Sequence, residues 1–173
     1  MILVISTCAD KLHEREFVSP VVNSVKNFDE DVLIVHYEDL GFEELEKANR
    51  AIICGTSLYD FEYLNHFEKF NWIKDFSKPL LGICAGMQII GKTFGGEVLE
   101  DKEIGQGEMD FSEDFLGLVG KQKVYFLHGK SVSLPPNFEG DKIIFKHKEK
   151  NIYGVLFHPE VYNAQLIENF VKL

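Results

Sequence analysis

The sequence predicts an α/β protein with an open, mostly parallel sheet and extra antiparallel strands in its C-terminal half. Two observations support this fold class. Before residue 95, short and nearly continuous apolar runs recur, as in strands buried on both faces of a parallel sheet; these runs are 2–6, 31–37, 51–56 and 79–84. After residue 95, strand-like pieces are joined by Gly, Pro and charged turns; these pieces are 95–111, 121–136, 140–151 and 152–161.

Amphipathic segments separate the apolar runs and predict helices on both faces of the sheet. Their apolar residues recur at helical spacing in 17–28, 41–50 and 59–76. In 59–76 the apolar stripe includes Phe61, Phe67 and Trp72, and we expect these aromatic side chains to pack into the core. The pattern also predicts a helix over 85–94, directly after a strand, and another over 163–173.

Length and charge narrow the function classes. A chain of 173 residues suits one domain with a full core, so we expect residues 1–173 to form a single domain. The net charge of −10 argues against nucleic-acid and anionic-membrane partners, because either surface needs a basic patch. No apolar run approaches the ~20 residues that span a bilayer, and no secretory signal is recognisable at the start. We therefore expect a cytoplasmic protein.

The number and spacing of the cysteines argue against disulfides and structural metal sites. There are three, Cys8, Cys54 and Cys84. An odd number without a C-x-x-C pair argues against a disulfide framework and against a zinc ribbon. We expect no metal and no cofactor, and we expect Cys8 and Cys54 to pack in the core.

Cys84 stands out because of its glycine frame, "GICAG" at 82–86. A thiol at the tip of a strand, flanked by glycines and followed by a helix, is the cysteine version of the nucleophile elbow. The sharp turn strains the backbone of the central residue and leaves no room for neighbouring side chains. The helix start favours a thiolate, and the same turn aims the Ala85 N–H at a developing oxyanion. A buried structural cysteine is the alternative interpretation.

A second motif favours the catalytic interpretation. In "YGVLFHPEV" an apolar strand ends in His158, Pro159 and Glu160. Proline forces the residue before it into an extended conformation, in which residues i and i+2 point to the same side. Glu160 can then orient His158 as a general base for a thiol. We expect the sheet to bring this pair to Cys84.

Together, "GICAGMQ" and "GVLFHPEV" resemble the class I glutamine amidotransferases, glutaminase domains with a Cys-His-Glu triad. "AIICGTS", "FGGEV" and "FLHGKSVSLPPNFE" extend the resemblance over most of the chain. The resemblance implies a flavodoxin-like sandwich. It also implies that Cys84 attacks the side-chain amide of glutamine, that His158 transfers protons and that Glu160 orients His158.

The resemblance implies further site residues. The oxyanion hole would use backbone N–H groups of Ala85 and of Gly55 or Thr56. Gln88 would help to hold substrate glutamine, and Gly129 lies in the stretch that binds its α-amino and carboxylate groups. His128, beside Gly129, is assigned no catalytic role.

Within the family, "EIGQGEMDF" and "KNIYGVLFHPEV" look most like the glutaminase subunit of a two-subunit GMP synthase. Three features depart from that pattern. Thr56 replaces a glycine of the oxyanion loop, Lys130 stands where aspartate is usual, and residues 7–20 do not match. We expect a glutaminase that forms a Cys84 thioester and passes ammonia to a separate synthase. A γ-glutamyl hydrolase or cysteine peptidase on the same fold, and a non-catalytic regulatory module, remain as alternatives.

Overall fold

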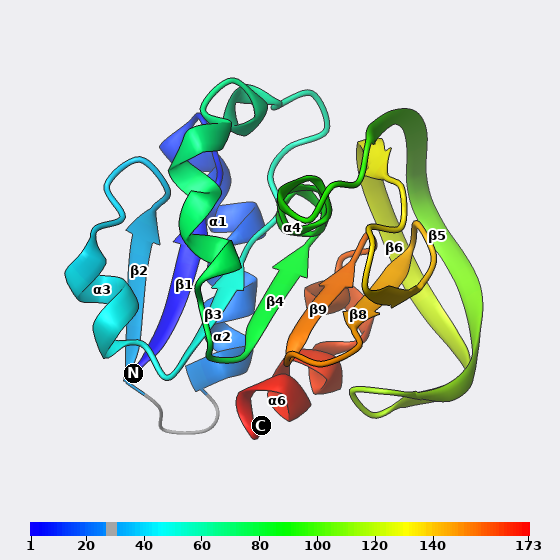
Figure 1. The fold of residues 1–173 in the computed structure, drawn as a ribbon. Coiled ribbons are helices and arrows are strands. Elements are labelled where there is room, and N and C mark those ends of the chain that lie inside the picture. The colour runs from blue at the N-terminus through cyan, green and yellow to red at the C-terminus, as the bar shows by residue number, and fades with distance from the viewer. Residues whose placement is uncertain (27–30) are drawn as a thin grey trace.

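A seven-stranded sheet forms the centre of the protein in a computed structural model that describes residues 1–26 and 31–173 (Figure 1). The strand order is β2-β1-β3-β4-β9-β8-β7. The strands are β1 (Ile2–Ser6), β2 (Val32–His36), β3 (Arg50–Ile53), β4 (Leu80–Ile83), β7 (Phe138–Gly140), β8 (Ile144–His147) and β9 (Ile152–Val155). The first five strands of this order, from β2 through β1, β3 and β4 to β9, pair in parallel. Strand β8 pairs antiparallel with β9, and β7 pairs antiparallel with β8. The open, mostly parallel sheet predicted from the sequence is confirmed.

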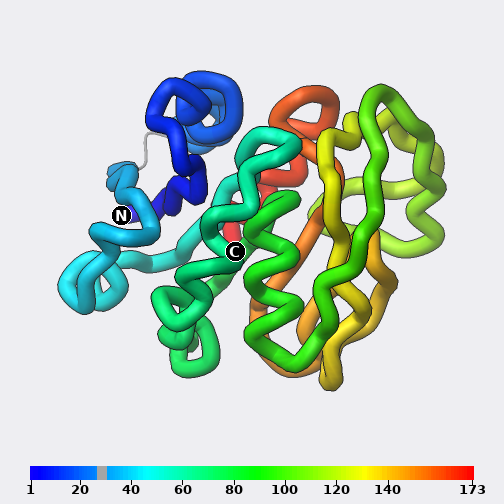
Figure 2. Tube along the Cα trace, turned by 90° about the horizontal axis from the view of Figure 1, so that it is seen from above, coloured from blue at the N-terminus to red at the C-terminus, as the bar shows by residue number. Residues whose placement is uncertain are grey.

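Both faces of the sheet are covered, as the view from above in Figure 2 shows. The helices are α1 (Glu14–Phe17), α2 (Ser19–Lys26), α3 (Phe42–Lys47), α4 (Ala85–Thr93), α5 (Pro159–Tyr162) and α6 (Ala164–Val171). Successive side chains of a strand point to opposite faces. Accordingly, Ile2 and Val4 pack in one core cluster with α2 and α6, and Leu3 and Ile5 pack in a second cluster with α4. Over residues 1–26 and 31–173, no helix is long and apolar enough to cross a membrane.

Two predicted helical segments differ in detail from the structure. Segment 17–28 is divided between α1 and α2, and its last two residues lie outside the described part of the chain. Segment 59–76 forms two 3₁₀ helices, η2 (Glu62–Leu64) and η3 (Phe67–Lys74), in place of an α-helix.

The spacing of apolar residues explains the 3₁₀ geometry. Leu64, Phe67, Phe70 and Ile73 recur every third residue, and a helix with three residues per turn places such residues on one line. Phe70 and Ile73 are fully buried, and Leu64 and Phe67 pack against the same cluster. The predicted core role of Phe61, Phe67 and Trp72 is confirmed, since they pack against this cluster, although the helix type is different. Tyr59, at the start of the segment, is 72% exposed.

A long hairpin provides two further antiparallel strands of the second half. Strands β5 (Val98–Phe115) and β6 (Leu118–Val132) form a two-stranded sheet of their own, beside β8 and β9 in Figure 1. The turn between them uses positive φ angles at Leu116 (51°) and Gly117 (85°). Buried residues on the inner face of the hairpin, such as Val124, join the core beneath it. The hairpin thereby brings β6 next to the carboxyl edge of the parallel strands.

Candidate active site

Cys84 lies between β4 and α4, in the sharp turn that the sequence predicts. Its backbone is strained, with φ 50° and ψ −103°. The flanking glycines are required by close backbone contacts. A Cβ at Gly82 would lie 2.5 Å from the Gly86 carbonyl carbon, and a Cβ at Gly86 would collide with the Ile53 carbonyl. The glycine frame therefore allows the strand, the turn and the helix to pack directly on one another.

His158 follows β9 in an extended conformation, with φ −97° and ψ 93°, as predicted for a residue before proline. Its backbone N–H donates to the Tyr125 carbonyl of β6 at 2.8 Å. The His158 Nδ1 lies 2.7 Å from Glu160 Oε1. The predicted contact is present, but its geometry differs, because Pro159 starts the short helix α5 and Glu160 occupies the first turn.

Cys84, His158 and Glu160 are nearly sealed from solvent. Cys84 is 4% exposed and His158 is 2% exposed; the side chain of Glu160 is 3% exposed. Burial alone would lower the pKa of the His158 imidazole. The Glu160 carboxylate, which is hydrogen-bonded to the ring, and the neighbouring Cys84 outweigh burial and raise this pKa well above its usual value. These neighbours therefore favour the protonated form of the ring, so the imidazole is suited to accept a proton from the thiol.

The imidazole presents its second nitrogen for the thiol. Glu160 occupies Nδ1, and Nε2 has no hydrogen-bond partner that meets ordinary geometry within the described residues. Both side chains lie against Gly55, where a Cβ would be 2.8 Å from His158 Cε1 and 3.2 Å from Cys84 Cβ. Cys84 Sγ donates to the Leu127 carbonyl at 3.6 Å. A small rotation of the Cys84 side chain would let the thiol donate to His158 Nε2 in place of the Leu127 carbonyl.

The three residues expected to form an oxyanion hole surround the thiol. Ala85 is the first residue of α4, and Thr56 and Ala85 line the same small cavity as Cys84. Neither Gly55 nor Thr56 has a positive φ. The Gly55 carbonyl accepts a long hydrogen bond from Cys8 Sγ at 3.9 Å. The structure therefore brings Gly55, Thr56 and Ala85 together, and their role as oxyanion donors stays a prediction.

The cavity in front of Cys84 is almost closed. Its free volume is about 10 Å³, roughly the space that one water molecule needs. Gln88 and Gly129 line it, as expected for residues that hold substrate. The Gln88 amide is already occupied, because its Oε1 accepts from Tyr63 Oη at 2.6 Å and its Nε2 donates to the Lys130 carbonyl at 2.8 Å. A substrate as large as glutamine therefore needs the walls to move.

His128 is a site residue to which the sequence assigned no role. It is buried, it lines the cavity with Cys84, and neither ring nitrogen has a hydrogen-bond partner within the described residues. Burial lowers the pKa of its imidazole. The signal was the alternation of β6, where buried Val124 and Phe126 share a face with His128. The neutral ring offers a donor and an acceptor to a ligand in the cavity.

The other two cysteines pack in the core, as expected. Cys8 and Cys54 are buried free thiols. Burial raises the pKa of Cys8 and raises that of Cys54 well above its usual value. Both therefore stay protonated at neutral pH. Among the described residues, no group of three His, Cys, Asp or Glu side chains is placed to hold a metal ion.

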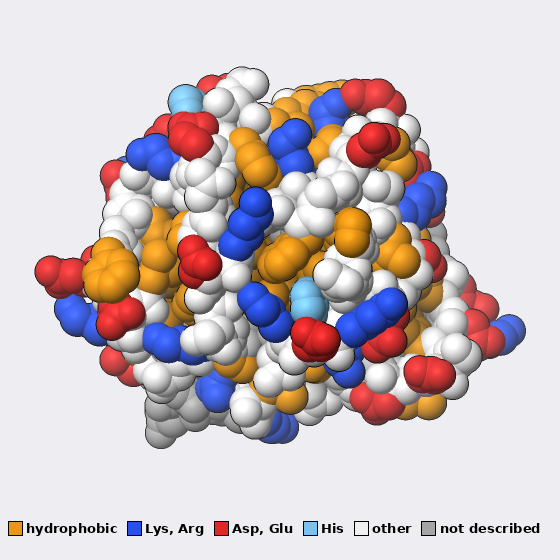
Figure 3. Space-filling model, viewed as in Figure 1, with side chains coloured by type: hydrophobic (Ala, Val, Ile, Leu, Met, Phe, Trp, Pro, Cys, Tyr) orange, Lys and Arg blue, Asp and Glu red, His pale blue; other side chains and the backbone are white. Residues whose placement is uncertain are grey.

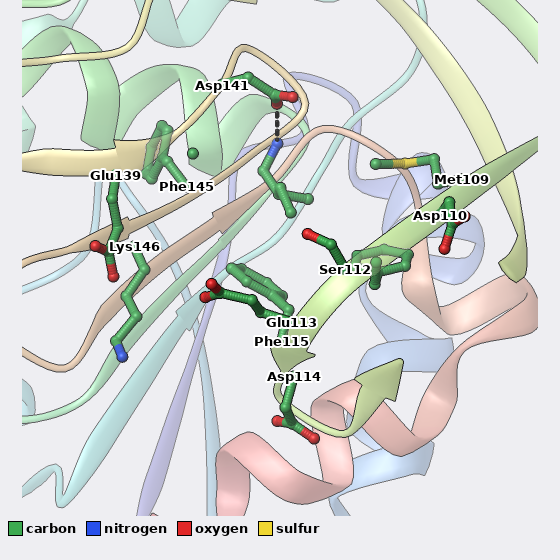
Figure 4. A pocket seen from close by; sticks show the side chains of 13 residues that line it. Met109, Asp110, Ser112, Glu113, Asp114, Phe115, Glu139, Asp141, Phe145 and Lys146 are labelled. Carbon is green, nitrogen blue, oxygen red and sulfur yellow. Dashed lines mark hydrogen bonds between the residues drawn. The ribbon is translucent and has the colours of Figure 1, made fainter. Parts of the chain in front are cut away.

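A much larger cavity lies away from the thiol. It has a volume of about 440 Å³ and lies between the end of β5 and strands β7 and β8 (Figure 4). Acidic side chains such as Glu113 and Glu139 surround a partly aromatic floor that includes Phe115 and Phe145. None of the site residues lines it. Cavity size alone would therefore misplace the chemistry, which follows from the strained thiol and its buried neighbours.

The carboxyl ends of β3, β4 and β9 carry Gly55, Cys84 and His158 to one edge of the sheet, where open α/β folds keep their sites. The fold is that of an α/β protein, and its candidate site combines a thiol, an imidazole and a carboxylate, the set of groups that nucleophilic catalysis by cysteine uses. The family model for class I glutamine amidotransferases matches residues 13–172. The chain belongs to the class I glutamine amidotransferase family.

Similar proteins include subunits named as part of glutamine-hydrolyzing GMP synthases. The glutamine-hydrolyzing GMP synthase subunit of Methanobrevibacter smithii is 33% identical over 151 residues, which cover 78% of this chain and 78% of that protein. The same subunit of Methanosphaera stadtmanae is 37% identical over 150 residues, which cover 76% of this chain and 79% of the relative. A crystal structure of a Thermoplasma acidophilum protein, described as a GMP synthase subunit of this kind, superposes with a TM-score of 0.81 at 25% identity, over 99% of this chain and 93% of that one.

Proposed function

We propose that this chain is the glutaminase subunit of a GMP synthase, folded as a single domain over residues 1–173. It hydrolyses glutamine to glutamate and passes the ammonia to a separate synthase subunit in the cytoplasm. The observation that carries the proposal is the buried Glu160–His158 pair beside a strained thiol, with a 2.7 Å contact between carboxylate and imidazole. The names of the two relatives support the choice of GMP synthase.

The proposed reaction begins with transfer of the Cys84 proton to His158 Nε2. The thiolate attacks the side-chain amide carbon of glutamine, and the oxyanion that forms accepts hydrogen bonds from the Ala85 and Thr56 N–H groups. His158 then gives its proton to the departing ammonia. Water, deprotonated by the same imidazole, hydrolyses the γ-glutamyl thioester, and glutamate leaves. Glu160 holds the ring and stabilises its charged form throughout.

The surface charge and the cavity beside Cys84 bear on the kinds of ligand that the chain can take. Acidic and basic side chains are interspersed on the face in Figure 3, in keeping with a net charge of −10 and with no nucleic-acid partner. The cavity beside Cys84 is almost closed, whereas a γ-glutamyl hydrolase or a peptidase needs an open cleft that admits the tail of its substrate.

The test is glutamate release from free glutamine by the purified chain, alone and with the matching synthase, its nucleotide acceptor and ATP. Wild type should release glutamate and, in the complete mixture, support GMP formation, whereas Cys84→Ala should support GMP formation only from added ammonia. Hydrolysis of γ-glutamyl peptides without turnover of glutamine would instead indicate a γ-glutamyl hydrolase. Binding of the synthase without any hydrolysis would indicate a regulatory module.

A further inference from the structure

Asp60 organises the loop that follows β3. Its Oδ2 accepts a hydrogen bond of 2.6 Å from Thr56 Oγ1 and another of 2.8 Å from the Ala9 N–H. Its Oδ1 accepts from the Glu62 N–H at 3.3 Å, and its own N–H donates to the Ser57 carbonyl at 3.0 Å. One half-buried carboxylate therefore joins the start of the loop, its far end and the segment after β1.

Within this network, the Thr56 side chain lies beside the Cys84 cavity. Thr56 is buried and lines the cavity with Cys84 and Ala85. Fixing its hydroxyl fixes the rotamer, and for a β-branched residue the rotamer is coupled closely to the backbone. The charge of the carboxylate makes this hydrogen bond stronger than one between neutral groups. Asp60 therefore restrains the backbone N–H of Thr56.

The same carboxylate connects this N–H to the atypical segment 7–20. Ala9 donates to Asp60, and its neighbour Cys8 donates through Sγ to the Gly55 carbonyl. Both ends of the Gly55–Thr56 unit are thus tied to residues 8–9. A displacement of this segment would reach the loop beside Cys84 through two hydrogen bonds.

We infer that Asp60 is a positioning residue, which acts through Thr56 to hold the backbone donor of residue 56 at the place where the oxyanion forms. This inference rests on the proposed glutaminase function. Glycine at position 56 would have no side chain for Asp60 to hold, so this way of positioning the donor requires threonine or serine at that position. The donor acts on the transition state, and loss of its positioning lowers kcat more than it raises KM.

The experiment compares steady-state kinetics of the synthase complex carrying Asp60→Ala, Thr56→Val, both together, Asp60→Asn and Thr56→Ser. Asp60→Ala and Thr56→Val should each lower kcat about tenfold or more, less than the roughly 10²–10³ of a lost oxyanion donor, with KM within about twofold. The double variant should be no slower than the slower single, because the two residues share one interaction. Asp60→Asn and Thr56→Ser retain an acceptor or a hydroxyl and should stay within about threefold of wild type.

Glu62→Ala is the matched control, since it removes the same charge two residues away from a side chain that contacts His66 and Asn65 instead of Thr56. A second readout is independent of turnover. Amide hydrogen exchange of residues 55–62 should accelerate in Asp60→Ala and Thr56→Val and remain unchanged in Glu62→Ala. Alkylation of Cys84 by iodoacetamide forms no oxyanion and should proceed at the wild-type rate in all folded variants.

Three outcomes would overturn the inference: unchanged exchange in Asp60→Ala, full additivity of the two single variants, or a KM effect with kcat intact. Failure of the proposed function looks different. In that case the wild-type complex itself releases no glutamate, while the exchange data still report whether Asp60 holds the loop.

Discussion

The His158 imidazole and the Glu160 carboxylate lie 2.7 Å apart with both side chains almost fully buried. A buried ion pair of this kind is stabilising only while both partners are charged, because removal of one leaves an uncompensated charge. The pair therefore links the protonation of a single imidazole to the stability of the folded chain, and its effect can be measured without any assay of activity.

Stability should fall as pH rises above the ordinary range of histidine. The folded-state pKa of His158 is raised well above the unfolded value near 6.5, so its contribution is fully present below about pH 6.5 and is lost as pH rises through the folded pKa. Urea unfolding of wild type and Glu160→Gln between about pH 6 and 9 measures this. The difference in free energy of unfolding between wild type and Glu160→Gln should be largest at the acidic end and should decrease as pH rises. A difference that stays constant with pH would contradict the prediction.

A glutamine-analogue diazo-ketone should label Cys84 and leave Cys8 and Cys54 unmodified. Cys84 faces the cavity beside a base, whereas burial raises the pKa of both other thiols. Peptide mapping by mass spectrometry locates the adduct, and the Cys84→Ala variant is the control. An adduct on Cys8 or Cys54 in the native protein would show that the glycine frame does not mark the nucleophile.

Cys84→Ala and His158→Ala should each abolish glutamine turnover, whereas Glu160→Ala should leave a measurable remainder. An orienting residue contributes less than the nucleophile or the base, and residues that act as a unit are non-additive. Glutamate release by each single variant and by the Cys84→Ala/His158→Ala double variant decides this. A double variant far slower than either single would mean that the two side chains act separately.

Gly86→Ala should destabilise the fold by more than about 2 kcal/mol, because the added methyl meets the Ile53 backbone, which has no room to move. Gly41→Ala is a matched control, since its methyl would meet only the flexible Glu44 carboxylate. Chemical denaturation of both variants gives the two free energies of unfolding. An equal decrease in the free energy of unfolding of both variants would show that the close packing at the turn contributes no more to stability than the contact at Gly41 does.

The features behind these tests differ in how far the sequence predicts them. The glycine frame of Cys84 and the proline after His158 impose local geometry through hard steric contacts, so the strained turn and the extended histidine could be predicted. The burial of the parallel strands follows from their uninterrupted apolar runs. Each of these depends on residues that are adjacent in the chain.

Other features depend on residues far apart, and no local pattern contains them. Asp60 lies 51 positions from Ala9, and Gln88 bonds Lys130 across 42 positions, so neither contact could be predicted from spacing. Asp60 looks like any polar turn residue until its partners are known. The closed cavity likewise results from the meeting of α4, β6 and the loop after β3, which only the tertiary arrangement determines.

Glutamine turnover by the isolated chain should be slow, and the matching synthase with its acceptor should accelerate it. A free glutaminase would release ammonia into solvent, so coupling of the two sites is useful. By the resemblance to the family, Thr56 replaces a glycine of the oxyanion loop, and a β-branched residue resists the positive φ that would let the backbone rearrange freely. The N–H that completes the oxyanion hole therefore needs a partner to reshape the loop.

Because that N–H acts on the transition state, the synthase should raise kcat more than it lowers KM. Steady-state glutamate release with and without the synthase measures both constants. Thr56→Gly is the informative variant, because it has two opposite effects. In the isolated chain glycine relaxes the backbone at this position, and in the complex it removes the side chain that Asp60 anchors, so the ratio of the complex rate to the isolated-chain rate should fall. Full-speed turnover by the isolated wild type, unchanged by the synthase, would refute this control by the partner and would favour a stand-alone hydrolase.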